Sequence, residues 1–280
     1  MPINLDILNK AMGPVPFSYD QDTVILYALG IGAGVKGPDF IYEKNLKVIP
    51  SFAVVPFMPV FFSTFVPAAG INIPALLHGE HHIILHRPIP VKATVYSTMV
   101  CDSIYDKGDK GAVLGITMET RDEENRLLFE NKAKVMDRSG GNFNGDRGPK
   151  TPVMEPPEGK ASDFRVEDAT SPDQAALYRL SGDKNPLHID PDFAAKGGFA
   201  RPILHGLCSF GFAARAILSS LCAGDPARLK AFSARFVNVV YPGETLTTEG
   251  WKSEPRGTYI IRTTNQDGKV ILGNACAEIG

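Results

Sequence analysis

Hydrophobic and polar positions divide the chain into two stretches built on the same plan. Each begins with a short helix-like run, Thr23–Leu29 in the first stretch and the residues around Tyr178 in the second. An irregular segment follows, then a long apolar segment, then short strand-like runs separated by Gly, Pro, Asp and Asn. This pattern predicts, in each stretch, a buried helix and a set of antiparallel strands.

The similarity between the two stretches extends to individual residues. Tyr27 falls on Tyr178, and Pro90 falls on Pro242. Three pairs of segments match in the same order, namely Ser18–Gly30 with Ser171–Gly182, Ile84–Val95 with Phe236–Thr247, and Arg126–Lys132 with Lys269–Ala275. We interpret the chain as a tandem duplication, because ordered self-similarity of this kind is hard to obtain by chance.

A segment rich in glycine and proline separates the two copies. Nine of the 22 residues from 139 to 160 are Gly or Pro, a composition typical of a linker. The predicted organisation is residues 1–138 as the first half, 139–160 as the linker and 161–280 as the second half.

Helices and strands are predicted most clearly in the second half of the sequence. Leu204–Leu221 follows Pro202 and is apolar nearly all round, which indicates a buried helix. The strands expected after it are Ala231–Tyr241, Glu244–Lys252, Thr258–Asn265 and Val270–Ile279. One buried helix followed by an antiparallel meander predicts an α+β fold, in which a sheet curls round the helix.

The long apolar segment of the first half, Val48–Leu77, contains no charged residue. Its length alone could span a bilayer. Its five prolines, however, are expected to break any single helix. We therefore expect a bent, buried segment and no membrane span. It is interpreted either as plain core or as the wall of a pocket for an apolar ligand.

Composition narrows the classes of function. The formal net charge is -2, which gives no reason to expect nucleic acid or an anionic membrane as a partner. The four cysteines are far apart and form no C-x-x-C, so they are expected to be reduced thiols. No signal peptide is evident at the start, and the final residues are not a peroxisomal tripeptide.

The segment Tyr178–Asp190 contains the most informative polar residues. Asp183, Asn185 and His188 lie within six residues of one another. A carboxylate and an imidazole can both accept a proton from one water molecule, and an amide can orient that water. Pro186 limits how far the three side chains drift apart. The alternative is a polar turn with a structural role alone.

Two observations favour chemistry over a structural turn. The aligned stretch of the first half, Gly30–Pro38, has no acid or histidine at the matching positions, so the repeat folds without them. In addition, His205-Gly206 opens the buried helix, where unpaired N–H groups and the helix dipole can hold a developing oxyanion. Gly206 has no Cβ and lets a ligand oxygen approach closely. Together these features indicate proton chemistry beside a carbonyl.

Tyr178–Asp190 followed by Gly198–Gly211 also resembles the motif of R-specific 2-enoyl-CoA hydratases, the hydratase 2 members of the MaoC-like branch of the hot-dog superfamily. The whole chain resembles the hydratase 2 portion of type 2 peroxisomal multifunctional enzymes. The resemblance implies a double hot-dog fold in which only the second half keeps the catalytic motif. It implies syn addition of water to a trans-2-enoyl-CoA, giving a (3R)-3-hydroxyacyl-CoA in fatty-acid β-oxidation or related acyl-CoA metabolism, with no cofactor and no metal.

The same resemblance implies roles for individual residues. The catalytic group comprises Asp183, His188, Asn185 and Glu43. The residues expected to contact the substrate are His78, Gly79, Lys107, Gly206 and Phe236. The uncharged Val48–Leu77 segment is expected to form the acyl-chain tunnel.

Other signals are weaker. Gly32–Gly37 satisfies G-x-G-x-x-G, but it follows a helix and not a strand, so nucleotide binding is not expected. Histidines crowd the segment from His78 to His86, yet they lack zinc-site partners apart from Glu80. A thioesterase that uses the same helix end, or an inactive acyl-CoA-binding duplicate, stays open as an alternative.

The expected partner is an acyl-CoA thioester, without nucleic acid or membrane, and a homodimer is left open. The chain is expected to be cytoplasmic if it is a standalone bacterial-type protein. It is expected to be peroxisomal if it is a fragment of a eukaryotic multifunctional enzyme.

Overall fold

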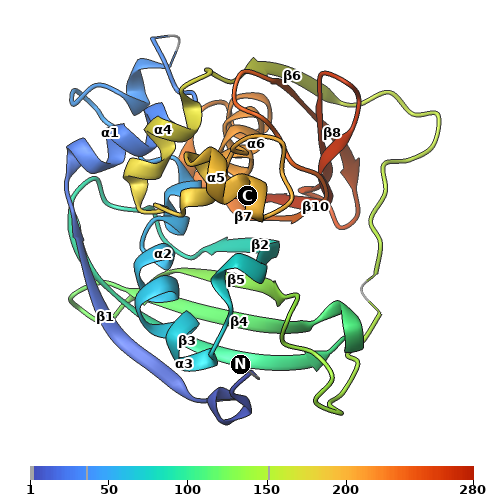
Figure 1. The fold of residues 1–280 in the computed structure, drawn as a ribbon. Coiled ribbons are helices and arrows are strands. Elements are labelled where there is room, and N and C mark those ends of the chain that lie inside the picture. Colours follow the sequence, from blue (N-terminus) through green and yellow to red (C-terminus); the bar gives the residue numbers. More distant parts are fainter. Residues whose placement is uncertain (1–2, 36, 151) are drawn as a thin grey trace.

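A single antiparallel sheet runs through both halves of the computed structural model, which describes residues 3–35, 37–150 and 152–280 (Figure 1). Its strand order is β1-β3-β4-β5-β2-β7-β10-β9-β8-β6. The first half supplies β1 (Ala11–Tyr19), β2 (Leu76–Leu85), β3 (Ala93–Asp106), β4 (Ala112–Arg121) and β5 (Leu127–Asp137). The second supplies β6 (Phe164–Ala169), β7 (Leu229–Phe236), β8 (Thr245–Ser253), β9 (Thr258–Asn265) and β10 (Val270–Ile279).

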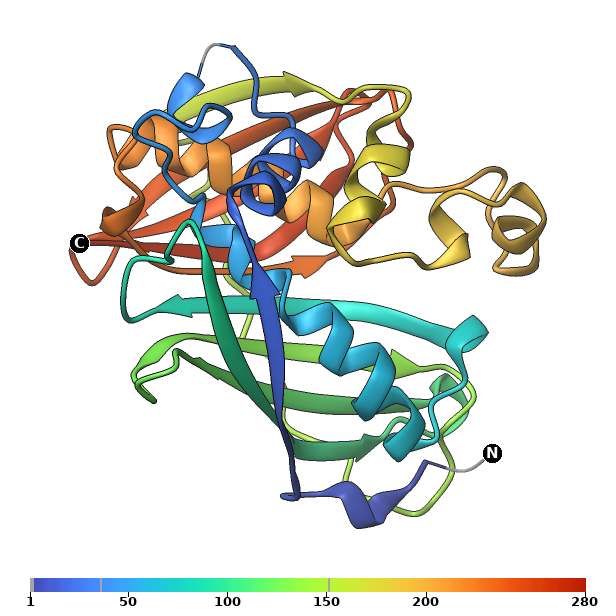
Figure 2. The ribbon, with the colours of Figure 1, turned by 90° about the vertical axis from the view of Figure 1, so that its left-hand side faces the viewer.

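Helices occupy corresponding places in the two halves. They are α1 (Gln21–Gly30), a helical run Pro50–Ala69 that includes α2 (Phe57–Val60) and α3 (Val66–Ala69), α4 (Gln174–Tyr178), α5 (Pro191–Lys196) and α6 (Gly206–Leu221). In Figure 2 the helical run, in light blue, lies across the strands of the first half, and α6, in orange, lies across those of the second. This is the expected double hot-dog arrangement.

The pairing of β2 with β7 defines a local two-fold axis at the centre of the sheet. The alignment that places Ile84 on Phe236 has an offset of 152 residues. Under it, the pair Glu80–Arg235 maps onto Phe232–Ile83, which is itself a pair in the same ladder. The two halves are therefore equivalent in register as well as in strand order, which confirms the tandem duplication.

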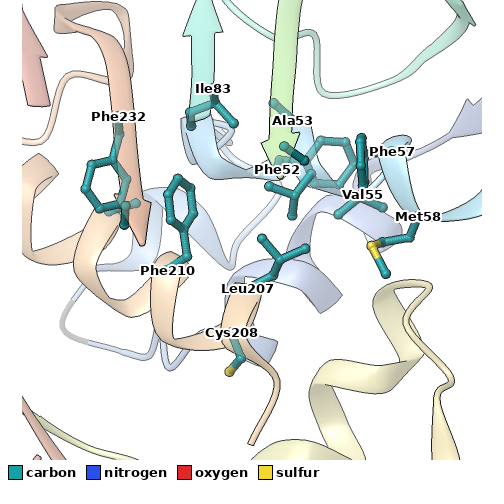
Figure 3. Close-up of a cluster of buried hydrophobic side chains, with 14 of the residues drawn as sticks. Phe52, Ala53, Val55, Phe57, Met58, Ile83, Leu207, Cys208, Phe210 and Phe232 are labelled. Carbon is teal, nitrogen blue, oxygen red and sulfur yellow. The ribbon is translucent and has the colours of Figure 1, made fainter. Parts of the chain in front are cut away.

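The two central helices and the central strands share one core. Figure 3 shows Phe52 and Val55 of the helical run meeting Leu207 and Phe210 of α6, beside Phe232 of β7. Phe52 and Phe210 are completely buried. The rings of Phe210 and Phe232 stack with centroids 4.3 Å apart. Because apolar burial is the main favourable term in folding, the shared core joins the two halves into one folding unit.

The expected break in the uncharged segment is wrong for residues 50–69, which form one helical run. The run begins as a 3₁₀ turn at Pro50–Val54 and includes a π turn at Phe61–Phe65. These changes of hydrogen-bond pattern accommodate the prolines, which cannot donate a backbone hydrogen bond. The run is long and apolar enough to cross a membrane, but 67% of its most apolar window is buried in the fold. A core helix passes the same length and composition test.

Two strands were not expected from the sequence. β1 and β6 lie at the two edges of the sheet, before α1 and α4. β1 contains Pro14 and Pro16, which edge strands tolerate and which weaken a strand signal. The strand predicted as Ala231–Tyr241 is also shorter than expected, because β7 ends at Phe236. Just beyond that end, the Asn238 side chain donates to the carbonyl of Val270 at 2.8 Å. Residues 139–150 and 152–160 contain no helix or strand, as predicted for a linker.

Candidate active site

Local hydrogen bonds fold the segment between α4 and α5 into a tight loop. The Asn185 N–H donates to Oδ1 of Asp183 at 3.2 Å, and the Leu187 N–H donates to Oδ1 of Asn185 at 3.1 Å. Pro186 then opens a short 3₁₀ turn that ends at His188. Side chains bonded to the backbone two residues on are typical of Asx turns. The loop therefore brings Asp183 and His188 to the same side without help from distant residues.

A longer-range hydrogen bond selects the tautomer of His188. Its Nδ1–H donates to the carbonyl oxygen of Ile203 at 2.9 Å. A carbonyl only accepts hydrogen bonds, so the proton resides on Nδ1 and Nε2 keeps its lone pair. The imidazole is therefore oriented as a base.

Burial shifts both members of the pair toward their neutral forms. Asp183 is 9% exposed and His188 is 8% exposed. Burial raises the pKa of the Asp183 carboxyl above its ordinary value and lowers the pKa of the His188 imidazole, and the mutual attraction of the two groups opposes both shifts. A protonated carboxyl beside a neutral imidazole supplies one acid and one base.

His205 is a third member of the site and was not predicted as one. Its ring is fully buried and lies 3.7 Å from the His188 ring, centroid to centroid. Its Nε2–H donates to the backbone carbonyl of Asp183 at 3.1 Å. Burial lowers its pKa well below the ordinary value, so the ring is neutral. His205 thus holds the Asp183 backbone against the start of α6. The sequence feature that could have identified it as a site residue is its position directly before Gly206.

One water molecule fits between the polar atoms of this site. Asp183, His188 and His205 each place one oxygen or nitrogen within 4.8 Å of the others. A water that makes two hydrogen bonds of about 2.8 Å separates its partners by about 4.4 Å. A metal ion fits less well, because imidazole lone pairs lie in the ring planes and the His188 and His205 planes are stacked, only 30° apart.

The start of α6 provides unpaired donors beside an aromatic wall. Gly206 is the first residue of α6, and within the described ranges its N–H and that of Leu207 have no backbone acceptor. A Cβ on Gly206 would lie 3.0 Å from the Phe236 ring. The Phe236 ring in turn lies 5.0 Å from that of His78. The structure thus brings Gly206, Phe236 and His78 together from three elements.

His78 is held by a buried chain of hydrogen bonds. Its Nε2 lies 3.2 Å from Nδ1 of His81, whose Nε2 lies 2.9 Å from Oδ1 of Asn131. The Asn131 amide donates to the carbonyl of Ala53 on the helical run. Burial lowers the pKa of His78 to about 4. These histidines therefore serve as neutral links between β2, β5 and the helical run.

The helical run of the first half also contacts the loop of the second. A Cβ on Gly182 would lie 3.8 Å from Cβ of Met58. Beside the loop, a small cavity is lined by Asn185 together with Arg138 and Lys196, and this cavity is called the entrance cavity below. The candidate site is therefore built from both halves.

Models of known families cover both halves separately. The MFE-2 hydratase 2 N-terminal domain matches residues 17–139, and the MaoC-like domain matches residues 153–272. The probable enoyl-CoA hydratase 2 of Dictyostelium discoideum is 38% identical over 98% of this chain and 95% of that protein. The peroxisomal enoyl-CoA hydratase 2 of Arabidopsis thaliana is 37% identical over 92% of this chain and 89% of that protein. The chain belongs to the MaoC-like hydratase 2 family.

Solved structures place this hydratase 2 family member in the same fold. A MaoC-like dehydratase from Phytophthora capsici aligns with a TM-score of 0.87 and 30% identity, over 99% of this chain and 98% of that one. The full-length peroxisomal multifunctional enzyme type 2 of Drosophila melanogaster aligns with a TM-score of 0.83 and 35% identity, over 96% of this chain but only 48% of that one. A Mycobacterium tuberculosis protein described as a double hot-dog fold aligns at 0.62 and 13% identity, which supports the fold alone.

Three expected site residues of this hydratase 2 family member lie apart from the cluster. Lys107 is on the turn between β3 and β4, beside Arg147, at the sheet end that also carries Arg138. Gly79 lies at a break in the pairing of β2 with β5.

The third of these residues, Glu43, is exposed, and its catalytic role stays a prediction. Phe40, near it in the chain, lines a hollow with Arg215 and Ser219. Arg215 lies more than two turns beyond Gly206 on α6. Lys36, within the G-x-G-x-x-G segment, falls outside the described residues.

Proposed function

We propose that this protein adds water to trans-2-enoyl-CoA thioesters and forms (3R)-3-hydroxyacyl-CoA, a step of fatty-acid β-oxidation. The observation that carries the proposal is the Asp183–His188 pair, which burial shifts toward its neutral form and which Ile203 and His205 orient, beside the open start of α6. Enoyl-CoA hydration is also the activity in the names of the Dictyostelium and Arabidopsis relatives.

Water addition uses the pair as base and acid. The water between Asp183 and His188 attacks C3 of the enoyl group, and one water proton moves to Nε2 of His188. C2 receives the proton of the Asp183 carboxyl. In this step one O–H bond of water, the O–H bond of Asp183 and the C2=C3 π bond break, while the C3–O, C2–H and His188 N–H bonds form. The proton then passes from His188 to Asp183, which restores the neutral pair. Since one loop carries both groups, hydroxyl and proton reach the same face of the double bond.

The start of α6 supplies the electrophilic assistance. As water attacks C3, negative charge develops on the thioester carbonyl oxygen. The N–H of Gly206 lies at the positive end of the sixteen-residue helix α6. It stabilises the developing charge by donating a hydrogen bond to the carbonyl oxygen. Phe236 and His78 restrict the slot beside Gly206 and orient the thioester. Asn185 positions the water at the mouth of the loop.

The rest of the substrate spans both halves. The phosphates of coenzyme A lie at the entrance cavity near Arg138 and Lys196, with Lys107 on the same side. The acyl chain runs along the helical run past Met58. The two ends of the predicted tunnel segment line cavities, Val48 and Pro50 the one beside Lys230, and Ile73 and Leu77 the entrance cavity. The buried Met58 moves to let the chain pass. Glu43 has no part in this proposal.

The cellular location depends on whether the chain is a standalone protein or a fragment of a larger enzyme. A standalone bacterial-type protein of this kind acts in the cytoplasm. A fragment of a eukaryotic multifunctional enzyme acts in the peroxisome, the location in the name of the Drosophila relative. A homodimer stays a prediction, which sedimentation of the purified chain tests.

A hydration assay with separation of product enantiomers tests the function. We expect loss of the enoyl absorbance, no release of free thiol, and the 3R product. Release of coenzyme A without loss of the enoyl group would indicate a thioesterase instead. Binding without either change would indicate an inactive acyl-CoA-binding protein.

A further inference from the structure

The two-fold axis between β2 and β7 relates the entrance cavity to a second cavity on the first half. This second cavity has a volume of about 390 Å³ and is called the first-half cavity here. At the same offset of 152 residues, Pro74, Leu77 and Phe199 of the entrance cavity correspond to Pro226, Leu229 and Lys47 of the first-half cavity. The two cavities are therefore lined by equivalent parts of the repeat.

The elements that shape the two cavities also correspond. A short 3₁₀ turn precedes β2 at Ile73–Ala75, and another precedes β7 at Pro226–Arg228. Pro202, ahead of α6, corresponds to Pro50, which begins the helical run and lines the first-half cavity. The duplication thus preserved the approach to the start of the central helix in both halves.

The mouth of the first-half cavity is cationic. Arg87 and Lys230 line it together with His86 and with Lys47, whose ammonium is paired with the Asp39 carboxylate at 2.8 Å, and the one carboxylate in the lining is that of Asp225. The Asp225 carboxylate already accepts a hydrogen bond from the N–H of Ala227 at 3.0 Å. Arg87 and Lys230 are exposed, and the described residues contain no ion pair for either. The entrance cavity has the same character, with Arg138 and Lys196 and no carboxylate.

The interior of the first-half cavity is apolar. Val48, Ile89 and Leu229 line it and are themselves buried. An apolar interior with cations at the mouth complements a ligand that carries phosphates at one end of an amphipathic arm. The first-half loop Gly30–Pro38, which aligns with the loop that carries Asp183 and His188, contains no acid or histidine, so it offers such a ligand no equivalent of that pair.

We infer that the first-half cavity is a second, non-catalytic site for a coenzyme A thioester. The inference rests on the proposed function for the choice of ligand, because the equivalent entrance cavity receives coenzyme A in that proposal. Each chain then binds two thioester molecules and converts one of them.

Calorimetric titration of the purified full-length chain with decanoyl-CoA tests the inference. Decanoyl-CoA has no double bond, so binding is measured without turnover. We expect two sites per chain. The double variant Arg87→Glu, Lys230→Glu should keep one site and hydrate enoyl-CoA with a kcat/KM within about twofold of the unsubstituted protein. Decanoate, which lacks phosphates, should not compete for the first-half cavity.

A matched double variant with the same change of charge, Arg138→Glu, Lys196→Glu, serves as the control. It should lose the other site and raise KM for hydration at least tenfold. One site in the unsubstituted protein, two sites in the Arg87→Glu, Lys230→Glu variant, or equal competition by decanoate would each overturn the inference. Two sites in a protein that does not hydrate enoyl-CoA would refute the proposed function and leave the second site standing.

Discussion

The loops that follow α1 and α4 have equivalent places in the repeat but different contents. In the first half, Gly32 has a φ of +79°, and a Cβ there would lie 2.5 Å from the Phe212 ring. Arg215 closes the same space by donating to the carbonyl of Ile31 at 3.1 Å. In the second half, a Cβ on Gly182 would meet only Met58 and Val55, at 3.8 and 3.9 Å, and the loop goes on to carry Asp183 and His188.

The difference shows how the same fold carries a structural loop in one half and a loop with candidate catalytic residues in the other. Both loops connect a short helix to a central helix, and the fold needs only the connection. Where α6 of the neighbouring half fills the space with Phe212, the loop must be glycine. Where the helical run presents Val55 and Met58 at a greater distance, the loop can hold an acid and a base.

The largest expected effect comes from the second-half loop. Asp183→Asn and His188→Ala should each lower the hydration kcat by about 10²–10⁴-fold, the usual contribution of a general acid or base. Decanoyl-CoA binding should be nearly unchanged. Because the two groups act on one water molecule, the double variant should be little worse than the poorer single one. A hydration rate equal to that of the unsubstituted protein in either variant would contradict the assignment.

The reverse change in the first-half loop should affect stability and not catalysis. Gly32→Asp places a side chain against Phe212 at a positive φ, which costs about 1–3 kcal/mol of unfolding free energy. Urea denaturation measures this loss. Gly34→Ala is the matched control, because a Cβ there meets nothing within 4 Å. Unchanged stability of Gly32→Asp would show that the first-half loop is not filled as described.

A smaller effect is expected where the helical run faces the catalytic loop. Met58→Trp adds bulk beside Gly182 and should reduce kcat/KM for a ten-carbon enoyl-CoA about tenfold more than for a four-carbon one. The reason is that the longer acyl chain must pass this position, and each methylene buried there contributes about 0.8 kcal/mol. Steady-state assays on both substrates measure the ratio. Equal losses on the two substrates would place the acyl chain elsewhere.

The smallest effect concerns acid stability. Burial lowers the pKa of His78 from 6.5 to about 4, and it lowers the pKa of His81 and His205 as well. Below pH 6.5 the unfolded chain binds protons that the folded chain excludes, so stability is lost as the pH falls from 6.5 toward 4. Thermal unfolding at pH 7 and pH 5 should show a lower Tm at pH 5. His78→Gln should reduce that difference by a few degrees, and an unreduced difference would mean that His78 does not contribute.

Much of the fold and the heart of the site could be predicted because their determinants are local. The Asp183–His188 loop is organised by hydrogen bonds across two residues, a separation that a motif contains. The α6 helix and the strand Thr258–Asn265 follow from apolar periods and turn residues next to them in the chain. The duplication, read from three ordered matches, carried these expectations to both halves and so predicted the double hot-dog.

Tertiary structure alone decided the features that depend on distant residues. Whether the prolines of 50–69 break a helix depends on packing against α6, which favours a continuous helical run over a bent coil. The partnership of His78 with Phe236 and Gly206 arises because β2 and β7 meet at the two-fold axis. The place of His205 beside His188 was decided in the same way, because sequence records which residues are present, but only packing determines which of them share a volume from which water is excluded.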